Sequence, residues 1–250
     1  MKISVLANGL VGLEVVKFLL KQGDEISSLV IPGQNSAFDK EILKIAGVSD
    51  DAVFTGNTAK NPGYISHLES TAPDFILTIY WPWLLESNVF KKATNTVNFH
   101  PAPLPVNRGW YPHVHSIIDG SPLGVTLHQI DENADTGPIW AQKILELYPY
   151  EIASDVYKRL QDEMIKLFKE SWSAIKSGRI NPVKQNENNG NYHKKHEIDA
   201  LDLIDIEKRY VAKDLINLLR ARSFGECGFA YFEEKGKKIY LKLSLDGEKE

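Results

Sequence analysis

Three side chains in the middle of the chain have the chemistry that acyl transfer requires. They are Asn98, His100 and, 35 residues after the histidine, Asp135. A neutral imidazole can accept the proton that an attacking amine loses, and a nearby carboxylate orients the imidazole and raises its basicity. An asparagine amide can donate a hydrogen bond to the negative oxygen of a tetrahedral intermediate. Together the three types suit attack by an amine on an activated acyl carbon.

The surrounding sequence favours this hypothesis over more ordinary ones. Taken singly, a strand-end asparagine more often caps a turn, a lone histidine is more often structural, and Asp-Thr-Gly at 135–137 is typical of a turn. Asn98 and His100, however, are two residues apart at the end of an apolar strand pattern, so their side chains point to the same side. A stiff, proline-rich loop at 101–105 and then Arg108-Gly109 follow, and rigid loops after strands often carry catalytic groups.

The first 150 residues predict an α/β domain with a mostly parallel sheet, because short β-branched runs alternate with helical patterns. Predicted strands cover residues 3–7, 26–31, 75–79 and 96–99, and predicted helices cover 9–22, 38–46 and 64–70. Asn98 and His100 therefore fall at the carboxyl end of a predicted strand, where open α/β sheets bind their ligands.

The remaining chain predicts a second, smaller part. Strands at 124–130 and 139–147 are expected as an antiparallel extension, followed by a helix at 154–177 with Ser154 as its N-cap. Residues 181–191 have the composition of a linker. We therefore predict a catalytic domain at 1–180, a linker at 181–191 and a C-terminal region at 192–250. This region is expected to hold a helix at 211–222 and a β-hairpin of strands 229–233 and 238–243.

Composition excludes several classes of protein. The net charge of −4 argues against a broad nucleic-acid surface, which needs clustered Lys and Arg. Cys227 is the one cysteine, so neither an internal disulfide framework nor a cysteine-built zinc site is expected. No segment approaches the roughly 18 apolar residues of a membrane span, and the N-terminus is typical of a strand and turn rather than a signal peptide. We predict a cytoplasmic protein.

Residues 97–109 and 124–139 together resemble the signature of the 10-formyltetrahydrofolate-dependent formyltransferases. The resemblance implies a Rossmann-like formyltransferase domain in which Asn98, His100 and Asp135 are catalytic, 10-formyltetrahydrofolate is the cosubstrate and no metal is needed. One departure is that Ala102-Pro103 stand where relatives often carry Ser-Leu, so a side-chain role at position 102 is not expected.

The same resemblance implies a folate site. The aromatic stretch after the strand at 75–79 resembles the family's folate-binding loop, and the segment after residue 129 would line the same slot through its backbone. Each tryptophan, taken alone, is almost as typical of a core cap. The implied folate-binding residues are Tyr80, Trp81, Trp83, Leu84, Leu85, Ile130, Asp131 and Ala134.

The chain after residue 191 resembles the corresponding region of sugar N-formyltransferases, which act on nucleotide-linked amino deoxysugars. This implies a dTDP- or UDP-linked 3- or 4-amino-dideoxyhexose as acceptor, and a homodimer. Arg220 or Arg222 has the chemistry to bind a diphosphate, and aromatic side chains to stack on a base. The implied substrate-binding residues are Pro103, Arg108, Gly109, Tyr192, Lys194, Asn217, Arg220, Phe224 and Tyr231.

The sequence leaves other hypotheses open. The acceptor could be a different amine, such as an amino-acyl, peptidyl or tRNA-linked one, or the protein could bind folate or a nucleotide sugar without catalysis. A dinucleotide-dependent oxidoreductase is suggested only by Asn8-Gly9-Leu10-Val11-Gly12, which lacks the full G-x-G-x-x-G spacing.

Overall fold

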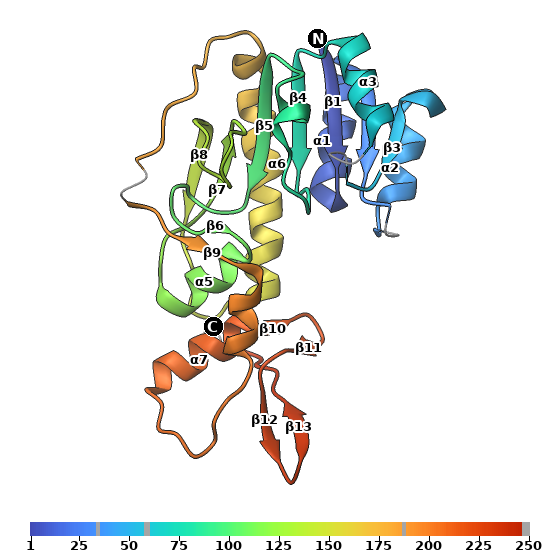
Figure 1. The fold of residues 1–250 in the computed structure, drawn as a ribbon. Helices are drawn as coiled ribbons and strands as arrows, with labels where there is room; N and C mark the ends of the chain where they lie inside the picture. Colours follow the sequence, from blue (N-terminus) through green and yellow to red (C-terminus); the bar gives the residue numbers. More distant parts are fainter. Residues whose placement is uncertain (34–35, 58–60, 187–188, 247–250) are drawn as a thin grey trace. The chain divides into compact units, whose positions relative to one another are not determined.

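A seven-stranded sheet forms the frame of the protein in the computed structural model, which describes residues 1–33, 36–57, 61–186 and 189–246 (Figure 1). The strand order is β3-β2-β1-β4-β5-β7-β8. The first five strands in this order pair in parallel, and β7 pairs antiparallel to β5. The strands are β1 (Lys2–Ala7), β2 (Glu25–Ile31), β3 (Val53–Thr55), β4 (Phe75–Ile79), β5 (Asn95–His100), β7 (Leu123–His128) and β8 (Ile139–Leu145).

Helices cover both faces of this sheet because its parallel strands are apolar on both sides. On one face, Phe75 of β4 packs edge-on against Trp172 with the ring centroids 5.0 Å apart. On the other, Ile76 joins a buried cluster with Tyr64 and Leu68. The helices of the sheet are α1 (Gly9–Lys21), α2 (Asp39–Ala46), η1 (Asp50–Ala52), α3 (Pro62–Thr71), α4 (Ser87–Phe90) and α6 (Ala153–Lys176).

Two compact units make up the chain. The first comprises residues 1–100, 126–142 and 161–185, and the second comprises 101–125, 143–160 and 186–250. The second unit is therefore assembled from three separate segments. Besides the C-terminal residues, this unit includes the loop that follows His100. The linker at 181–191 stays a prediction.

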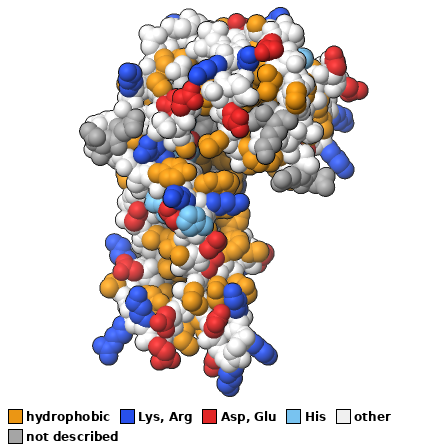
Figure 2. All heavy atoms as spheres, viewed as in Figure 1, with side chains coloured by type: hydrophobic (Ala, Val, Ile, Leu, Met, Phe, Trp, Pro, Cys, Tyr) orange, Lys and Arg blue, Asp and Glu red, His pale blue; other side chains and the backbone are white. Residues whose placement is uncertain are grey.

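The second unit is built around a contact between α5 (Pro112–Asp119) and α7 (Ala212–Ala221). Hydrophobic and charged side chains alternate over the exposed C-terminal elements in Figure 2. The remaining elements are β6 (Arg108–Gly109), β9 (Tyr192–His193), η4 (Lys195–Leu201), β10 (Ser223–Phe224), β11 (Cys227–Gly228), β12 (Tyr231–Glu234) and β13 (Lys237–Tyr240). Among the described residues, no helix is long and apolar enough to cross a membrane.

The structure confirms the predicted α/β fold and the C-terminal helix and hairpin. Lys235 and Gly236 both have positive φ, 50° and 73°, as a two-residue hairpin turn requires. The N-cap prediction is wrong, because Ser154 lies inside α6. The Asp155 carboxylate instead accepts the backbone N–H of Ile152 at 3.1 Å, so the helix begins one residue earlier than predicted.

Candidate active site

Asn98 and His100 end β5 and face the antiparallel strand β7. The register pairs Asn98 with His128 and His100 with Thr126. Asp135 lies in the loop between β7 and β8 and has φ of 57°. Because β7 runs antiparallel to β5, this loop leaves β7 beside the middle of β5, and it returns Asp135 to the two predicted catalytic residues.

Asp135 contacts both of the other predicted catalytic residues. Its Oδ2 lies 3.5 Å from His100 Nδ1, and its Oδ1 accepts from Asn98 Nδ2 at 3.3 Å. The His100 side chain is 6% exposed and that of Asp135 16%, so water competes little for either group. A carboxylate facing Nδ1 favours the tautomer with the proton on Nδ1, which leaves Nε2 as the basic nitrogen.

His128 also belongs to the site, although the sequence did not predict a role for it. Its Nδ1 is 2.6 Å from the carbonyl oxygen of Gln129, so Nδ1 carries the proton and donates it there. Its Nε2 then accepts from Asn98 Nδ2 at 2.9 Å. A histidine inside an apolar strand pattern is the signal in the sequence that could have indicated a role for His128. Its hydrogen bond to Asn98, however, follows from the antiparallel register of β5 and β7, which the sequence does not show.

The Asn98 amide is fixed from both ends. Thr78 Oγ1 donates to Asn98 Oδ1 at 2.7 Å. The two N–H groups of the amide point to His128 Nε2 at 2.9 Å and Asp135 Oδ1 at 3.3 Å. A hydrogen bond from Asn98 to a substrate oxygen would therefore replace the longer of these, the bond to Asp135.

The predicted folate-binding residues fall on two loops of the first unit, the loop after β4 and the loop after β7. Trp81 of the first loop and Ile130 of the second both pack against the buried cluster that contains Leu85. Trp81 and Trp83 lie edge to face at 5.3 Å. The Trp81 indole nitrogen is buried and has no hydrogen-bond partner among the described residues.

The other predicted folate residues have varied surroundings. Tyr80 has φ of 50°, and its carbonyl oxygen accepts from Asn8 Nδ2 at 2.8 Å, which ties the loops after β4 and β1 together. Leu84 is 75% exposed, and Ala134 is partly exposed. Asp131 accepts from Thr136 Oγ1 at 2.6 Å. Ile130 also lines a cavity of about 300 Å³ with Phe90, Lys91, Ala93, Thr94, Asn95, Thr96 and Gln129.

In the second unit, β6 pairs in parallel with β9 and brings Arg108, Gly109 and Tyr192 together. Gly109 has φ of 88°, and a Cβ there would lie 2.3 Å from the carbonyl oxygen of His193. Only glycine permits this approach. Tyr192 is 43% exposed beside it, Lys194 is exposed, and Pro103 is buried.

Arg220 and Arg222 are both buried and hydrogen-bonded within the second unit. Arg220 donates from Nε to the carbonyl oxygen of Glu151 at 2.9 Å, and from Nη1 to Asn217 Oδ1 at 2.9 Å. Arg222 forms an ion pair with Asp202. Both side chains are therefore enclosed. These bonds favour a structural role, and the prediction that Arg220 and Asn217 bind the substrate stays a prediction.

Phe224 and Tyr231, two of the three aromatic residues predicted to bind the substrate, lie in different settings. Phe224 is 38% exposed and stands beside Tyr157 with the ring centroids 5.8 Å apart. Tyr231 packs against Tyr240 and under the Lys238 ammonium, which is 4.1 Å from its ring centroid. Each ring is therefore partly covered, and their stacking on a base stays a prediction.

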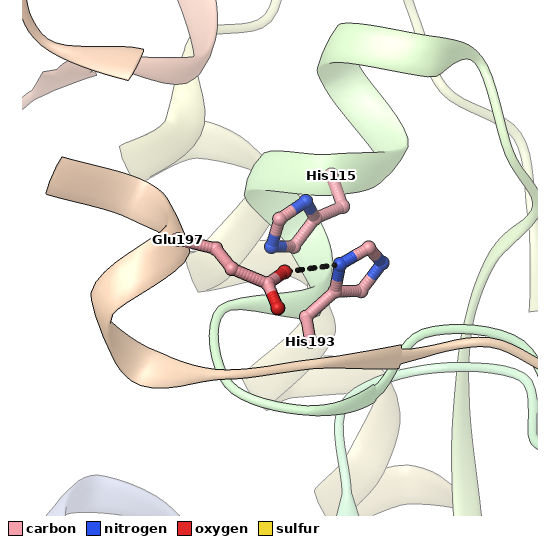
Figure 3. A group of neighbouring side chains, drawn as sticks. All are labelled: His115, His193 and Glu197. Carbon is pink, nitrogen blue, oxygen red and sulfur yellow. Dashed lines mark hydrogen bonds and ion pairs between the residues drawn. The ribbon is translucent and has the colours of Figure 1, made fainter. Parts of the chain in front are cut away.

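A second polar cluster consists of His115, His193 and Glu197 (Figure 3). His193 Nδ1 lies 3.1 Å from Glu197 Oε2, and the three candidate ligand atoms lie within 4.8 Å of one another. The two imidazole rings, however, are stacked at 3.4 Å and nearly parallel, at 8°. A ring nitrogen binds a metal along its in-plane lone pair, and two parallel planes this far apart cannot both contain one ion. As arranged, the cluster holds β9 and η4 against α5.

Comparison with known protein families accounts for both parts of the chain. Residues 14–171 match the model described as formyl transferase, and residues 197–247 match the N-formyltransferase dimerization C-terminal domain. The chain belongs to the formyl transferase family. The resemblance inferred from residues 97–109 and 124–139 is thus confirmed.

Two relatives illustrate the range of this family. A dTDP-4-amino-4,6-dideoxyglucose formyltransferase from Mycobacterium bovis is 36% identical over 154 residues, which are 61% of this chain and 65% of that protein. The match thus spans less than two thirds of the relative's length. A methionyl-tRNA formyltransferase from Lachnospira eligens is 26% identical over 90% of this chain and 73% of its own length.

Solved structures of formyltransferases share the fold. A 4-N formyltransferase from Francisella tularensis superposes with a TM-score of 0.86 at 26% identity, over 98% of each chain. A formyltransferase from Anoxybacillus kamchatkensis, in complex with UDP-4,6-dideoxy-4-formamido-L-AltNAc and tetrahydrofolate, has a TM-score of 0.58 at 25% identity, over 80% of this chain and 89% of that one.

Proposed function

We propose that the protein transfers a formyl group from 10-formyltetrahydrofolate to the amino group of a nucleotide-activated amino deoxysugar. The observation that carries the proposal is the convergence of Asn98 and His100 on Asp135, within 3.5 Å. An amide donor, a buried imidazole and its carboxylate partner are the groups that formyl transfer to an amine requires.

Each residue has a defined task in this reaction. The folate cosubstrate supplies the formyl group, which the sugar amine attacks. His100 Nε2 accepts the proton that the amine loses, while Asp135 holds the Nδ1 side of the ring and stabilises its positive charge. Asn98 donates to the formyl oxygen as negative charge develops on it. When the tetrahedral intermediate collapses, the bond between the formyl carbon and N10 of the folate breaks, and the proton held by His100 passes to the leaving nitrogen, which gives tetrahydrofolate and the formamido sugar. No metal is required for these steps.

Several features support a folate site at Tyr80–Leu85 and Ile130–Ala134. Trp81 and Trp83 supply flat apolar surfaces, and the buried Trp81 indole nitrogen offers a donor that the described residues do not use. A buried donor without a partner is unfavourable, so a ligand acceptor at that position would be stabilised. The tetrahydrofolate in the Anoxybacillus relative agrees with this cosubstrate.

The names of the relatives favour a dTDP- or UDP-linked 3- or 4-amino-dideoxyhexose as acceptor. In this chain, Arg108, Tyr192 and Lys194 gather at the β6–β9 pair, where Gly109 permits the close approach of β9. We propose that these residues contact the nucleotide sugar, that the reaction takes place in the cytoplasm, and that the product serves surface-polysaccharide synthesis.

A homodimer is also proposed. The C-terminal residues match a dimerization domain, and several large hydrophobic side chains there are exposed: Leu203, Ile206, Val211, Ile216, Phe229, Ile239 and Tyr240. Burying such a surface would stabilise a dimer. Sedimentation of the purified chain tests this, and a monomer at micromolar concentration would refute it.

The direct test is to incubate the purified protein with 10-formyltetrahydrofolate and dTDP-4-amino-4,6-dideoxyglucose, and to follow the sugar by mass spectrometry. We expect a formamido sugar and release of tetrahydrofolate. UDP-linked amino sugars and methionyl-tRNA serve as parallel acceptors, since the Lachnospira relative leaves a tRNA-linked amine as the second candidate. Formylation of the tRNA alone would overturn the sugar assignment.

A further inference from the structure

Gln185, in the segment that the sequence predicts to be a linker, holds the loop that carries Asp135. Its Nε2 donates to the carbonyl oxygen of Asp135 at 2.9 Å and to that of Gly137 at 2.7 Å. A single side-chain amide thus uses both N–H groups on one short loop, 48 and 50 residues away in the chain.

The backbone puts Gln185 in this position. Ile139 and Val183 exchange two backbone hydrogen bonds, each 2.8 Å long, as an antiparallel bridge. In antiparallel pairing, moving two residues forward from Val183 corresponds to moving two back from Ile139. Gln185 therefore lies opposite Gly137. On its other side Gly137 is pressed against Gln129, whose carbonyl oxygen would be 2.0 Å from a Cβ at this position.

Asp135 needs such support. Its φ of 57° lies in the left-handed region, which is unfavourable for a residue with a side chain and persists where the surroundings hold it. In this conformation the carboxylate reaches both Asn98 and His100. Gln185 bonds to the carbonyl of Asp135 itself, so it constrains the backbone that aims the carboxylate.

The orientation of the Gln185 amide does not serve stability alone. Gln185 Oε1 is buried and has no hydrogen-bond partner among the residues that the structure describes. Leaving a buried acceptor unpaired is unfavourable. The reverse orientation of the amide would place this oxygen against two carbonyl oxygens, so the observed orientation is the one that serves the loop.

We propose that Gln185 is a positioning residue that holds Asp135 in its catalytic geometry. The proposal rests on the proposed formyl transfer, because Asp135 has its catalytic role there. It assigns a reaction-specific task to a residue outside the strand-end motif.

The test compares wild type with Gln185→Met, which keeps the length of the side chain but removes both donors and the amide oxygen. We expect kcat to fall by about tenfold or more, with KM for both substrates within about threefold of wild type. The melting temperature should change little, because the loss of the two bonds to the loop is offset by the removal of a buried oxygen that has no partner among the described residues. Thr71→Val, which removes a 2.7 Å side-chain bond to the carbonyl of His67 far from the site, serves as the control and should keep wild-type kcat.

The outcomes separate this inference from the proposed function. If the wild type forms the formamido sugar and Gln185→Met keeps kcat within about twofold, the positioning role is wrong and the function stands. A loss of kcat accompanied by a matching loss of melting temperature would also overturn it. If the wild type forms no product, the histidine ¹⁵N spectra of both proteins decide: unchanged His100 and His128 signals refute the positioning role, and altered signals support it.

Discussion

At the scale of single residues, the proposed reaction depends on one proton passing to His100. We expect His100→Asn to lower kcat by at least about a hundredfold while the thermal unfolding temperature stays close to that of wild type. Asparagine is smaller than histidine and polar, so the fold should accept it. The measurement is steady-state formylation with saturating cosubstrates.

A matched control is His67→Asn on α3, which loses a 2.9 Å contact to the carbonyl of Ser27 but lies away from Asp135. Its kcat should match that of wild type. Full activity of His100→Asn would instead remove the imidazole from the mechanism.

His128 gives a second prediction at this scale. Replacing it by Phe removes the acceptor of one Asn98 N–H and the donor to the carbonyl of Gln129. Since these groups are buried, we expect a loss of roughly 2 kcal/mol in the free energy of unfolding. We also expect a lower kcat with little change in KM, because Asn98 is no longer held. Urea titration and kinetics measure the two effects, and an unchanged kcat would show that Asn98 needs no such support.

At the scale of elements, the β6–β9 pair depends on one glycine. Gly109→Ala should destabilise the protein by at least about 2 kcal/mol, because the new Cβ would lie 2.3 Å from the carbonyl oxygen of His193. Gly120→Ala is the matched control: its φ of 72° is also positive, but no atom lies within 4 Å of the new Cβ. It should lose only about 1 kcal/mol, from the backbone alone.

Urea unfolding of both alanine variants gives the comparison. Equal losses would mean that the close approach of β9 contributes nothing beyond the strained backbone. A larger loss for Gly109→Ala, together with weaker binding of a nucleotide sugar, would link the β6–β9 pair to the acceptor site.

At the scale of the whole molecule, stability should depend on pH through a buried histidine. Burial, with smaller contributions from His115 and Arg222, lowers the pKa of His113 to about 4. The folded protein thus keeps His113 neutral, whereas the unfolded chain takes up a proton near its ordinary pKa of 6.5. The stabilisation is complete above pH 6.5 and is lost as the pH falls towards 4, by roughly 3 kcal/mol.

Urea titrations at several pH values between 4 and 7.5 measure this slope. In His113→Phe the slope should be shallower, and part of it should persist because burial also lowers the pKa of His115 to about 4. An identical slope in wild type and variant would refute the assignment to His113.

Local features of this molecule, its strands, helices and catalytic residue types, could be predicted from the sequence. Contacts between distant segments could not. Periodicity predicted β4, β5 and α1 almost to the residue, and the types of Asn98 and His100 indicated the chemistry. The hydrogen bonds of His128 depend on the register between β5 and β7, and those of Gln185 depend on the bridge between Ile139 and Val183. The residue type of Arg220 predicts a phosphate ligand, but its bonds to Glu151 and Asn217 could not be predicted from local patterns. Such contacts join segments that local patterns cannot relate.

The loop that carries Asp135 is closed twice at its base, so its two ends are held together while its tip is exposed. Gln129 donates its N–H to the carbonyl of Pro138 at 2.8 Å, and Asp131 binds the Thr136 hydroxyl at 2.6 Å. Glu132 and Asn133 lie exposed beyond both closures. A fluorophore attached there would lie between Asp131 and Ala134, which we propose to contact the folate, and two residues from Asp135. This tip is therefore the natural point at which to attach a reporter of substrate binding.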